Sequence, residues 1–427
     1  MLKLIRNLIL GAGVVFVAFL GLLILASAVP SSSVNSRLGD SVTTLKKEGL
    51  YPSVGFPWRK IVLDNFTDSV MLNIAYSVDS SNPVRSAIRT IQFDGDDNAA
   101  DQILNLGKLY KKQDIHETVY ERYWHGYLVF LRPLLAITSY AGVRIVLTAV
   151  LFSIFAIFMH TSWKRLGVRT TFGLLVGFIA VDFFWLGKSL QLSNTFITGM
   201  LGSLYLLRKK NLSFLEVSTV FFIVGAVTQY IDVLSAPLVS LGLLLVITAG
   251  LLKKTIDLKK VVFFCILWSV GYLSLWGAKW ILAERTYVPG AITVGYKKVQ
   301  DRTMNSVDAQ FSRKNAVLRN FYQLRGYDKR DKIVLLVLGI CYAMFMVRYF
   351  SVKSASTKKV VMWIAVATIP YLWYFIVAEH SYIHVLFTYR NQFVTVFALF
   401  LVSTEFVDWK RVKRDILNIR EIHMGRG

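Results

Sequence analysis

The sequence predicts an all-α polytopic membrane protein with about ten transmembrane helices, both of its termini in the cytoplasm and a long exported loop after the first helix. The 427 residues are 55% hydrophobic and only 18% charged, whereas soluble globular chains hold about 25% charged residues. Apolar runs near the length of about 20 residues that a spanning helix needs recur along the chain. This composition excludes a disordered, coiled-coil or collagen-like protein, and it argues against a large soluble enzyme.

The apolar runs divide the chain into six segments. Ten candidate spans lie at about 7–29, 142–160, 171–187, 192–207, 214–231, 236–252, 261–283, 333–350, 360–378 and 385–404. The predicted organisation is a first helix in 1–29, an exported loop in 30–141, spans two to seven in 142–283, a basic exported loop in 284–332, spans eight to ten in 333–404 and a basic cytoplasmic tail in 405–427. The first run exceeds the usual length of the apolar region of a signal peptide, so a retained first helix is favoured over a cleaved one.

The net charge of +23 follows the predicted topology. The short loops and the two terminal segments on one side hold 22 Lys and Arg against six Asp and Glu, while loop 30–141 is balanced, with 12 of each. The positive-inside rule places the short loops in the cytoplasm, and it explains the charge without nucleic acid as a partner. Cys265 and Cys341 both fall in predicted spans, so no disulfide framework is expected in the exported loops.

Loop 30–141 is too long for a bare connection and is expected to fold on the membrane surface. Apolar residues at helical spacing predict helices over about 64–78 and 97–112. The sequence Tyr123-Trp124-His125-Gly126-Tyr127 leads into 128–139, which is apolar but too short to span. That length fits an interfacial or re-entrant helix.

Charged and polar residues gather at the exported ends of the predicted spans. They include Asp182, Asp232, Lys279, Glu379, His380, His384 and Arg390. Charged residues within spans are costly and usually face a cavity or a partner, although long side chains can instead extend to the interface. Lys279 lies between Trp276 and Trp280, which suits either an aromatic belt or a sugar-binding cavity. The clustering on one side predicts a hydrophilic cavity that opens outward.

Asp64 and Asp68 lie four residues apart, so a helix would place both carboxylates on one face. One interpretation is a general base presented at the membrane surface, where it takes a proton from an acceptor hydroxyl. The other is that Asp64 caps a helix and Asp68 lies in its solvated first turn. Both interpretations stay open at the level of sequence.

Arg390, directly after Tyr389, is the most informative cation, because a guanidinium suits bidentate binding of phosphate. Arg132, in the short apolar segment, is similar. His380 and His384 lie on one helical face but lack an obvious third metal ligand, so contacts to a sugar or phosphate are favoured. Asp94, Asp96 and Asn98 match a calcium loop only weakly. No cofactor is predicted, and a divalent metal stays open.

The stretches LDNFTDSVMLNIAY, YWHGYLVFLRPLL and EHSYIHVLFTYRN resemble segments of bacterial membrane proteins of surface-polysaccharide assembly. Together with the order of helices and loops, they make the chain resemble the GT-C superfamily of membrane glycosyltransferases. The resemblance implies a polyprenyl-phosphate sugar donor and a catalytic base in the first exported loop. By position that base would be Asp64 or Asp68, although the adjacent acidic pair of many members is missing here.

The leading hypothesis is therefore a glycosyltransferase of the cell membrane, with its active site on the extracytoplasmic side. It would move a sugar from a lipid-linked donor to an envelope glycan acceptor. Arg390, Lys279 and Arg132 would hold the phosphate, with Trp124, His125, His380, His384 and Tyr389 lining the sugar site. The alternative is a transporter or flippase of a lipid-linked glycan, which needs the cationic cavity but no base. A phosphoryl or acyl transferase is a third interpretation.

Overall fold

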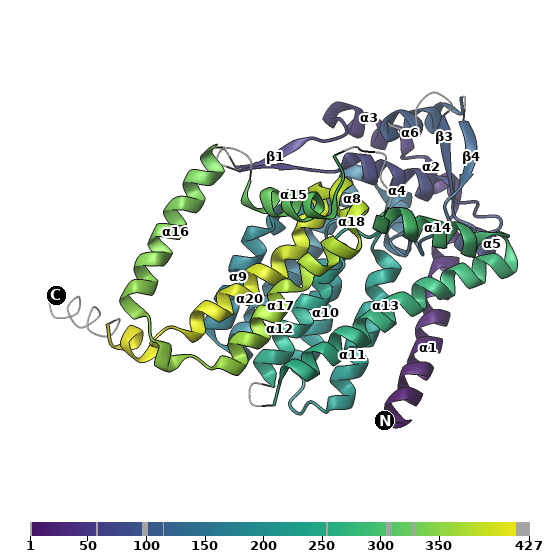
Figure 1. Cartoon of the computed structure of the whole chain (residues 1–427). Helices are drawn as coiled ribbons and strands as arrows, with labels where there is room; N and C mark the ends of the chain where they lie inside the picture. Colours follow the sequence, from purple (N-terminus) through teal and green to yellow (C-terminus); the bar gives the residue numbers. More distant parts are fainter. Residues whose placement is uncertain are drawn as a thin grey trace.

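A computed structural model describes residues 2–56, 59–95, 101–113, 115–252, 255–304, 308, 310–326 and 329–415. The protein is mostly helical. Long helices form a bundle, and short helices and two antiparallel pairs of strands cover one end of that bundle (Figure 1). We call residues 28–139, which supply most of this cover, the cap.

Seven helices of the described residues are long and apolar enough to cross a membrane, as expected of a multi-pass membrane protein. They are α1 (Leu2–Ser27), α8 (Tyr140–Leu166), α11 (Phe214–Ile231), α13 (Leu258–Thr286), α16 (Lys329–Tyr349), α17 (Thr357–Ile376) and the continuous stretch Val385–Glu405. That last stretch consists of α19 (Val385–Thr388), the 3-10 helix η3 (Tyr389–Gln392) and α20 (Phe393–Glu405).

The other three predicted spans correspond to shorter helices. These are α9 (Val168–Ala180), α10 (Asn194–Arg208) and α12 (Leu238–Leu251), of 13, 15 and 14 residues. At 1.5 Å per residue such helices extend about 20 Å, less than the roughly 30 Å of a hydrocarbon core. Irregular chain follows or precedes each of them, including the 3-10 helix η1 (Phe183–Lys188). The run predicted at 171–187 is α-helical only as far as Ala180, whereas the runs at 192–207 and 236–252 are α-helical over most of their length but form helices shorter than a hydrocarbon core.

The cap contains both helices predicted for the first long loop. Its elements are α2 (Ser31–Asn35), α3 (Leu38–Glu48), β1 (Ser53–Phe56), β2 (Arg59–Val62), α4 (Asn65–Ser77), α5 (Pro83–Ile88), β3 (Ile91–Gly95), α6 (Gln102–Lys111), β4 (Ile115–Val119) and α7 (Leu128–Ile137). Helices α4 and α6 match the predicted stretches, and α7 is the short apolar helix. The antiparallel pairs β1–β2 and β3–β4, which begin at Ser53↔Val62 and Ile91↔Val119, were not anticipated from the sequence.

The second long loop also folds. It carries α14 (Ala291–Met304) and α15 (Arg313–Arg325), and both lie at the same end of the bundle as the cap (Figure 1). The remaining short elements are η2 (Val352–Ser354) and α18 (Ala378–Ile383). Both long loops therefore meet at one end, as the predicted topology requires, and the N-terminus lies at the other end.

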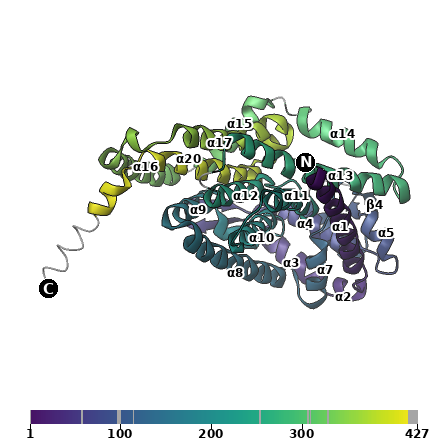
Figure 2. The same cartoon turned by 90° about the horizontal axis from the view of Figure 1, so that it is seen from below.

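Two glycines let α11 and α13 pack backbone against backbone. A Cβ on Gly225 would lie 2.1 Å from the carbonyl oxygen of Trp268, and a Cβ on Gly271 would lie 2.0 Å from that of Phe222. Small residues allow this close approach where helices associate within a membrane. Helices α17 and α20 pack against each other, and α20 also contacts α9 and α12 (Figure 2).

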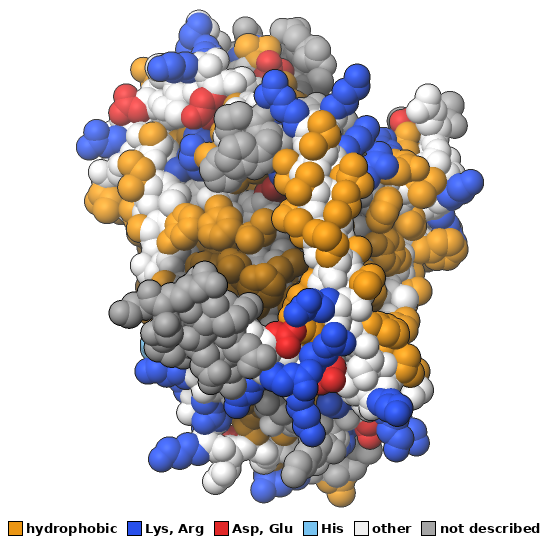
Figure 3. Space-filling view, turned by 90° about the vertical axis from the view of Figure 1, so that its left-hand side faces the viewer, with side chains coloured by type: hydrophobic (Ala, Val, Ile, Leu, Met, Phe, Trp, Pro, Cys, Tyr) orange, Lys and Arg blue, Asp and Glu red, His pale blue; other side chains and the backbone are white. Residues whose placement is uncertain are grey.

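Helix α16 stands apart from the bundle. Its hydrophobic side chains are exposed along the whole length, for example Leu336 at 63% and Val347 at 84%. Figure 3 shows this apolar column with basic side chains at both ends. Apolar residues in the middle and cations at the ends are the pattern of a lipid-facing span.

The predicted topology can be tested by labelling single cysteines in a variant that lacks Cys265 and Cys341. In intact cells a membrane-impermeant maleimide should label cysteines placed at the exposed positions Leu104 of α6 and Tyr296 of α14. It should label a cysteine at Lys353 only after permeabilisation, because that loop belongs to the basic side. Labelling at position 353 in intact cells would contradict the orientation.

Candidate functional site

Asp64 is the N-cap of α4. Its carboxylate accepts hydrogen bonds from Thr67 N at 3.1 Å, Thr67 Oγ1 at 2.7 Å and Gln191 Nε2 at 2.8 Å. The side chain is 5% exposed. The capping interpretation is thus confirmed for Asp64, but its expectation that Asp68 is solvated is wrong, since Asp68 is buried. The bond to Gln191 adds a connection from the cap to the bundle. The catalytic assignment of Asp64 stays a prediction.

Asp68, one turn later, is fully buried. It accepts hydrogen bonds from Tyr140 Oη at 2.7 Å, Ser189 Oγ at 2.9 Å and Leu190 N at 3.0 Å. Burial raises the pKa of the Asp68 carboxyl to about 7, although these hydrogen bonds pull it down. The predicted base therefore also joins α4 to α8 and to the turn that precedes α10.

Irregular chain at the cap end of the bundle supplies further polar groups. Two residues of these segments have left-handed backbone conformations. They are Asp182, two residues after the end of α9, with φ of 59°, and Leu234, between α11 and α12, with φ of 71°. Non-glycine residues adopt this conformation at some cost, often at functional sites. Gln191 accepts a hydrogen bond from Ser235 Oγ at 2.9 Å, and Asp232 accepts one from Ser235 N at 3.0 Å. A buried polar chain thus extends from Asp64 to Asp232.

A cavity of about 310 Å³ lies between hairpin β1–β2, the start of α16 and the segment before α20. Its lining residues are Ser53, Arg59, Lys60, Ile61, Val62, Asp182, Gln323, Gly326, Asp331, Leu386, Tyr389 and Arg390. We call it the Arg390 cavity. Three hydrogen bonds hold the carboxylate of Asp182 in this cavity. Arg59 donates two of them, at 2.7 and 2.9 Å, and Tyr389 Oη donates the third at 2.6 Å.

Arg390 is buried, at 1% exposure, beside this cavity. Its Nη1 donates to the carbonyl of Leu386 at 2.6 Å, and its Nε has no hydrogen-bond partner. Within the described residues, no carboxylate lies within 4.0 Å of its guanidinium. A buried cation without a counter-ion is costly, so the site is suited to an anion that enters the cavity.

The two other predicted phosphate ligands have backbone partners instead. The guanidinium of Arg132 donates to the carbonyls of Ala26, Ala75 and Val29. The ammonium of Lys279 donates to the carbonyls of residues 87 and 88, at 3.1 and 2.7 Å. Both side chains are fully buried and neither lines the Arg390 cavity. These contacts join α7 and α13 to other parts of the fold.

Trp124 and His125 are likewise packed inside the protein. Trp124 Nε1 donates to the carbonyl of Leu275 at 2.7 Å, and the ammonium of Lys279 lies 5.6 Å from the centre of its ring. His125 contacts the carbonyl of Tyr120 at 2.8 Å, and burial lowers its pKa to about 3. The structure therefore separates both from Arg390 and Tyr389, which the sequence analysis had grouped with them.

The rings of His380 and His384 lie next to each other, with their centres 4.6 Å apart and their planes inclined by 50°. Their polar neighbours are Arg302, 3.3 Å from His384 Nε2, and Glu379, which pairs with Arg302 at 3.1 Å. Burial, and then the charge of Arg302, lowers the pKa of His384 to about 3. No group of three His, Cys, Asp or Glu side chains suited to a metal occurs in the part of the chain that the structure describes. Residues 96–98 of the weak calcium motif lie outside that part.

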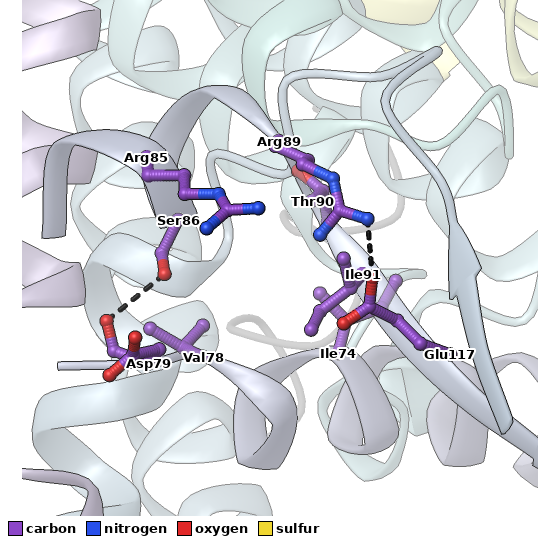
Figure 4. Close-up of a pocket in the computed structure, with 9 residues that line it drawn as sticks. All are labelled: Ile74, Val78, Asp79, Arg85, Ser86, Arg89, Thr90, Ile91 and Glu117. Carbon is purple, nitrogen blue, oxygen red and sulfur yellow. Dashed lines mark hydrogen bonds and ion pairs between the residues drawn. The ribbon is translucent and has the colours of Figure 1, made fainter. Parts of the chain in front are cut away.

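A smaller hollow of about 120 Å³ lies in the cap between α4 and α5 (Figure 4). The side chains of Arg85 and Arg89 border it, and Arg89 pairs with Glu117. Ligand pockets usually have volumes of about 300–1,000 Å³. This hollow is too small for a sugar, so the Arg390 cavity is the better candidate site.

The sequence analysis missed Arg59, Lys60 and Gln191 as members of the site. Arg59 and Lys60 lie in β2, and the pairing of β1 with β2 was not predicted from the sequence. That pairing would have been needed to place the two residues near Asp182, which is distant in the sequence. Gln191 lies in the short connection between the predicted spans 171–187 and 192–207. Its role depends on its contacts with Asp64 and Ser235, which are distant in the sequence.

The chain matches no protein-family model, no curated protein and no solved structure. The site is therefore interpreted from its own geometry.

The raised pKa of Asp68 predicts a pH dependence of stability. In the folded protein the pKa of Asp68 is about 7, which exceeds its value near 4 in the unfolded chain. The folded state therefore holds the proton more tightly, and this contribution to the free energy of unfolding is present at acidic pH and lost as the pH rises through about 7. Thermal unfolding in detergent should show a midpoint that falls from pH 5 to pH 8. Asp68→Asn should flatten that slope, and Asp79→Asn, at an exposed carboxyl whose pKa is lowered to about 2, should not. Equal slopes for wild type and Asp68→Asn would contradict the assignment.

Proposed function

We propose that the protein is a membrane glycosyltransferase. It transfers a sugar from a polyprenyl-phosphate-linked donor to a cell-envelope glycan acceptor on the extracytoplasmic side. Seven spanning helices and a folded cap support an enzyme whose donor is held in the bilayer and whose acceptor reaches it from the aqueous side. The order of helices and loops, which resembles that of the GT-C superfamily, points to the same chemistry. Three sequence stretches that resemble bacterial membrane proteins of surface-polysaccharide assembly agree with it.

The guanidinium of Arg390, which has no carboxylate within 4.0 Å among the described residues, carries this proposal. It lines a cavity of sugar-phosphate size together with Arg59 and Lys60, and its Nε lacks a partner. A phosphate would satisfy the free donors of Arg390, because a guanidinium presents a planar pair of N–H groups to two phosphate oxygens. The position of the cavity beside exposed α16 would leave the hydrocarbon chain of the donor in lipid.

The transfer itself requires a base and a site for the leaving group. The acceptor hydroxyl attacks the anomeric carbon, and a new carbon–oxygen bond forms as the bond to phosphate breaks. The electron pair of that bond leaves with the polyprenyl phosphate, whose charge Arg390 and Lys60 would stabilise. The hydroxyl proton passes to a carboxylate. Asp64 and Asp68 are the predicted bases, and Asp182 is added here because it lines the cavity.

Arg390 variants should weaken donor binding in a graded way. Arg390→Lys keeps the charge but loses the planar pair of donors, and Arg390→Ala loses both. Loss of hydrogen bonds to a charged group costs about 1.5–3 kcal/mol, or about 10- to 150-fold in donor affinity for Arg390→Ala. The measurement is binding of a labelled polyprenyl-phosphate sugar to purified protein in detergent.

Arg132→Lys is the matched control for that series. It alters a buried arginine whose donors all bind backbone carbonyls, so it should lower the unfolding temperature and leave donor affinity unchanged. Unchanged affinity in Arg390→Ala would remove Arg390 from the site.

Substitution of the candidate carboxylates distinguishes a glycosyltransferase from a transporter. Asp182→Asn, Asp64→Asn and Asp68→Asn keep the side-chain shape but cannot take up a proton, so the variant that removes the base should bind donor and fail to release polyprenyl phosphate. The loss in turnover should be about 10²–10⁴-fold. Lys353→Ala, in the loop at the far end, serves as a neutral control.

Wild-type protein that binds donor but releases no polyprenyl phosphate in the presence of acceptor glycan would contradict the transferase. A flippase would instead move the intact lipid in vesicles, and its movement would be insensitive to all three substitutions. If all three variants keep the turnover of the wild type, none of the three carboxylates is the base.

A further inference from the structure

A second cavity, of about 350 Å³, lies between α13, α14 and the end of α17. Its lining residues are Arg122, Tyr123, Leu234, Trp268, Ser269, Tyr272, Leu273, Trp276, Trp280, Gly295, Lys298, Val299, Arg302, Thr303, Trp373, Ile376 and Val377. We call it the tryptophan groove. It shares no lining residue with the Arg390 cavity among the residues that the structure describes.

Most of the groove is lined by apolar and aromatic side chains. Trp268 and Tyr272 stack with ring centres 5.1 Å apart, and Tyr123 stacks on Trp276 at 5.9 Å. Two lining residues of predicted spans, Leu273 and Ile376, are each 60% exposed. The open side of the groove therefore faces the region that lipid chains occupy around α13 and α17.

One end of the groove is cationic. Arg122, Lys298 and Arg302 all line it, and the Nε atoms of both arginines are buried without a hydrogen-bond partner. The indole Nε1 of Trp373 is also buried and unpartnered. Buried donors normally have partners. Glu379 pairs with Nη1 of Arg302 at 3.1 Å, and Asp301 lies 3.9 Å from the ammonium of Lys298. Of these three cations Arg122 alone has no carboxylate within 4.0 Å among the described residues, so the end keeps a net positive charge.

We propose that the tryptophan groove is a second lipid-binding site, for a single-chain lipid with a phosphate or pyrophosphate headgroup. The hydrocarbon chain packs on the tryptophans, and the headgroup accepts hydrogen bonds from Arg122, Lys298 and Arg302. A volume near the lower end of the usual range for ligand pockets suits one chain rather than the two of a phospholipid. Charge complementarity selects an anionic headgroup over a neutral one.

The two sites meet at one short segment. Arg302 of the groove contacts Glu379 and His384, and residues 386, 389 and 390 of the same segment line the Arg390 cavity. Lipid binding in the groove does not depend on the proposed transferase activity. If that activity holds, the groove is placed to present a lipid-anchored acceptor across residues 379–390 from the donor.

The test uses the full-length protein in nanodiscs of neutral lipid and a photoactivatable polyprenyl phosphate. Crosslinked peptides should map to 268–280 and 373–377. Lys298→Glu should lower this labelling at least about fivefold by charge reversal. Lys297→Glu, at the exposed neighbouring position of α14, should not lower it. Because Lys298 is itself partly exposed, its variant is expected to fold, and size-exclusion chromatography checks this.

Three outcomes would overturn the proposal. A photoactivatable neutral polyprenol that labels the same peptides equally well would exclude the headgroup contacts. Phosphatidylglycerol that competes as well as polyprenyl phosphate would exclude the single-chain assignment. Equal labelling of Lys298→Glu and Lys297→Glu would exclude the cationic end. Arg390→Ala should leave this labelling intact, so failure of the proposed function and failure of the groove are distinguishable.

Discussion

The structure depends on the burial of one carboxylate at the junction between cap and bundle. Asp68 is fully inside the protein and accepts hydrogen bonds from α8, through Tyr140, and from Ser189 and Leu190. A buried carboxylate is tolerable only with such partners, so cap and bundle have to meet in one relative position. Asp64 extends the same junction through Gln191 to Ser235. The cap therefore covers the bundle in a fixed register, and the walls of the Arg390 cavity, which come from both parts, are held together.

The junction also explains why three helices are short. Within a bilayer, non-helical backbone is tolerated where protein surrounds it or where it lines a water-filled cavity. The segments after α9 and before α12 are irregular, and residues such as Asp182 and Asp232 are only 8% and 2% exposed there. The cap provides the surrounding protein, and the irregular segments in turn supply the polar groups that a site requires. A regular helix continued through 181–187, or from α11 into α12 through 232–237, would have removed both.

The sequence was sufficient for the features that repeat along the chain. Apolar runs and basic loops indicated a multi-pass helical protein, and helical spacing indicated α4, α6 and α7. It was insufficient where the outcome depends on long-range contacts. The hairpin β1–β2 brings Arg59 into contact with Asp182, which is 123 residues away in the sequence. No local sequence pattern predicts that contact. The helix break at Asp182 was concealed because the residues around it, Phe178 and Phe183, are as apolar as any span interior.

The three predicted phosphate ligands show the limit most clearly, because Arg132, Lys279 and Arg390 present the same physical problem. Each is a cation in an apolar segment, and each is at most 1% exposed. Backbone carbonyls bind the donor groups of Arg132 and Lys279, so burial of these two charges stabilises the contacts between α1, α4, α5, α7 and α13. Arg390 has one carbonyl of its own helical turn and a free Nε beside a cavity. An apolar flank predicts burial for all three, but only the carbonyls that the rest of the chain brings near decide which cation keeps a donor group without a protein partner.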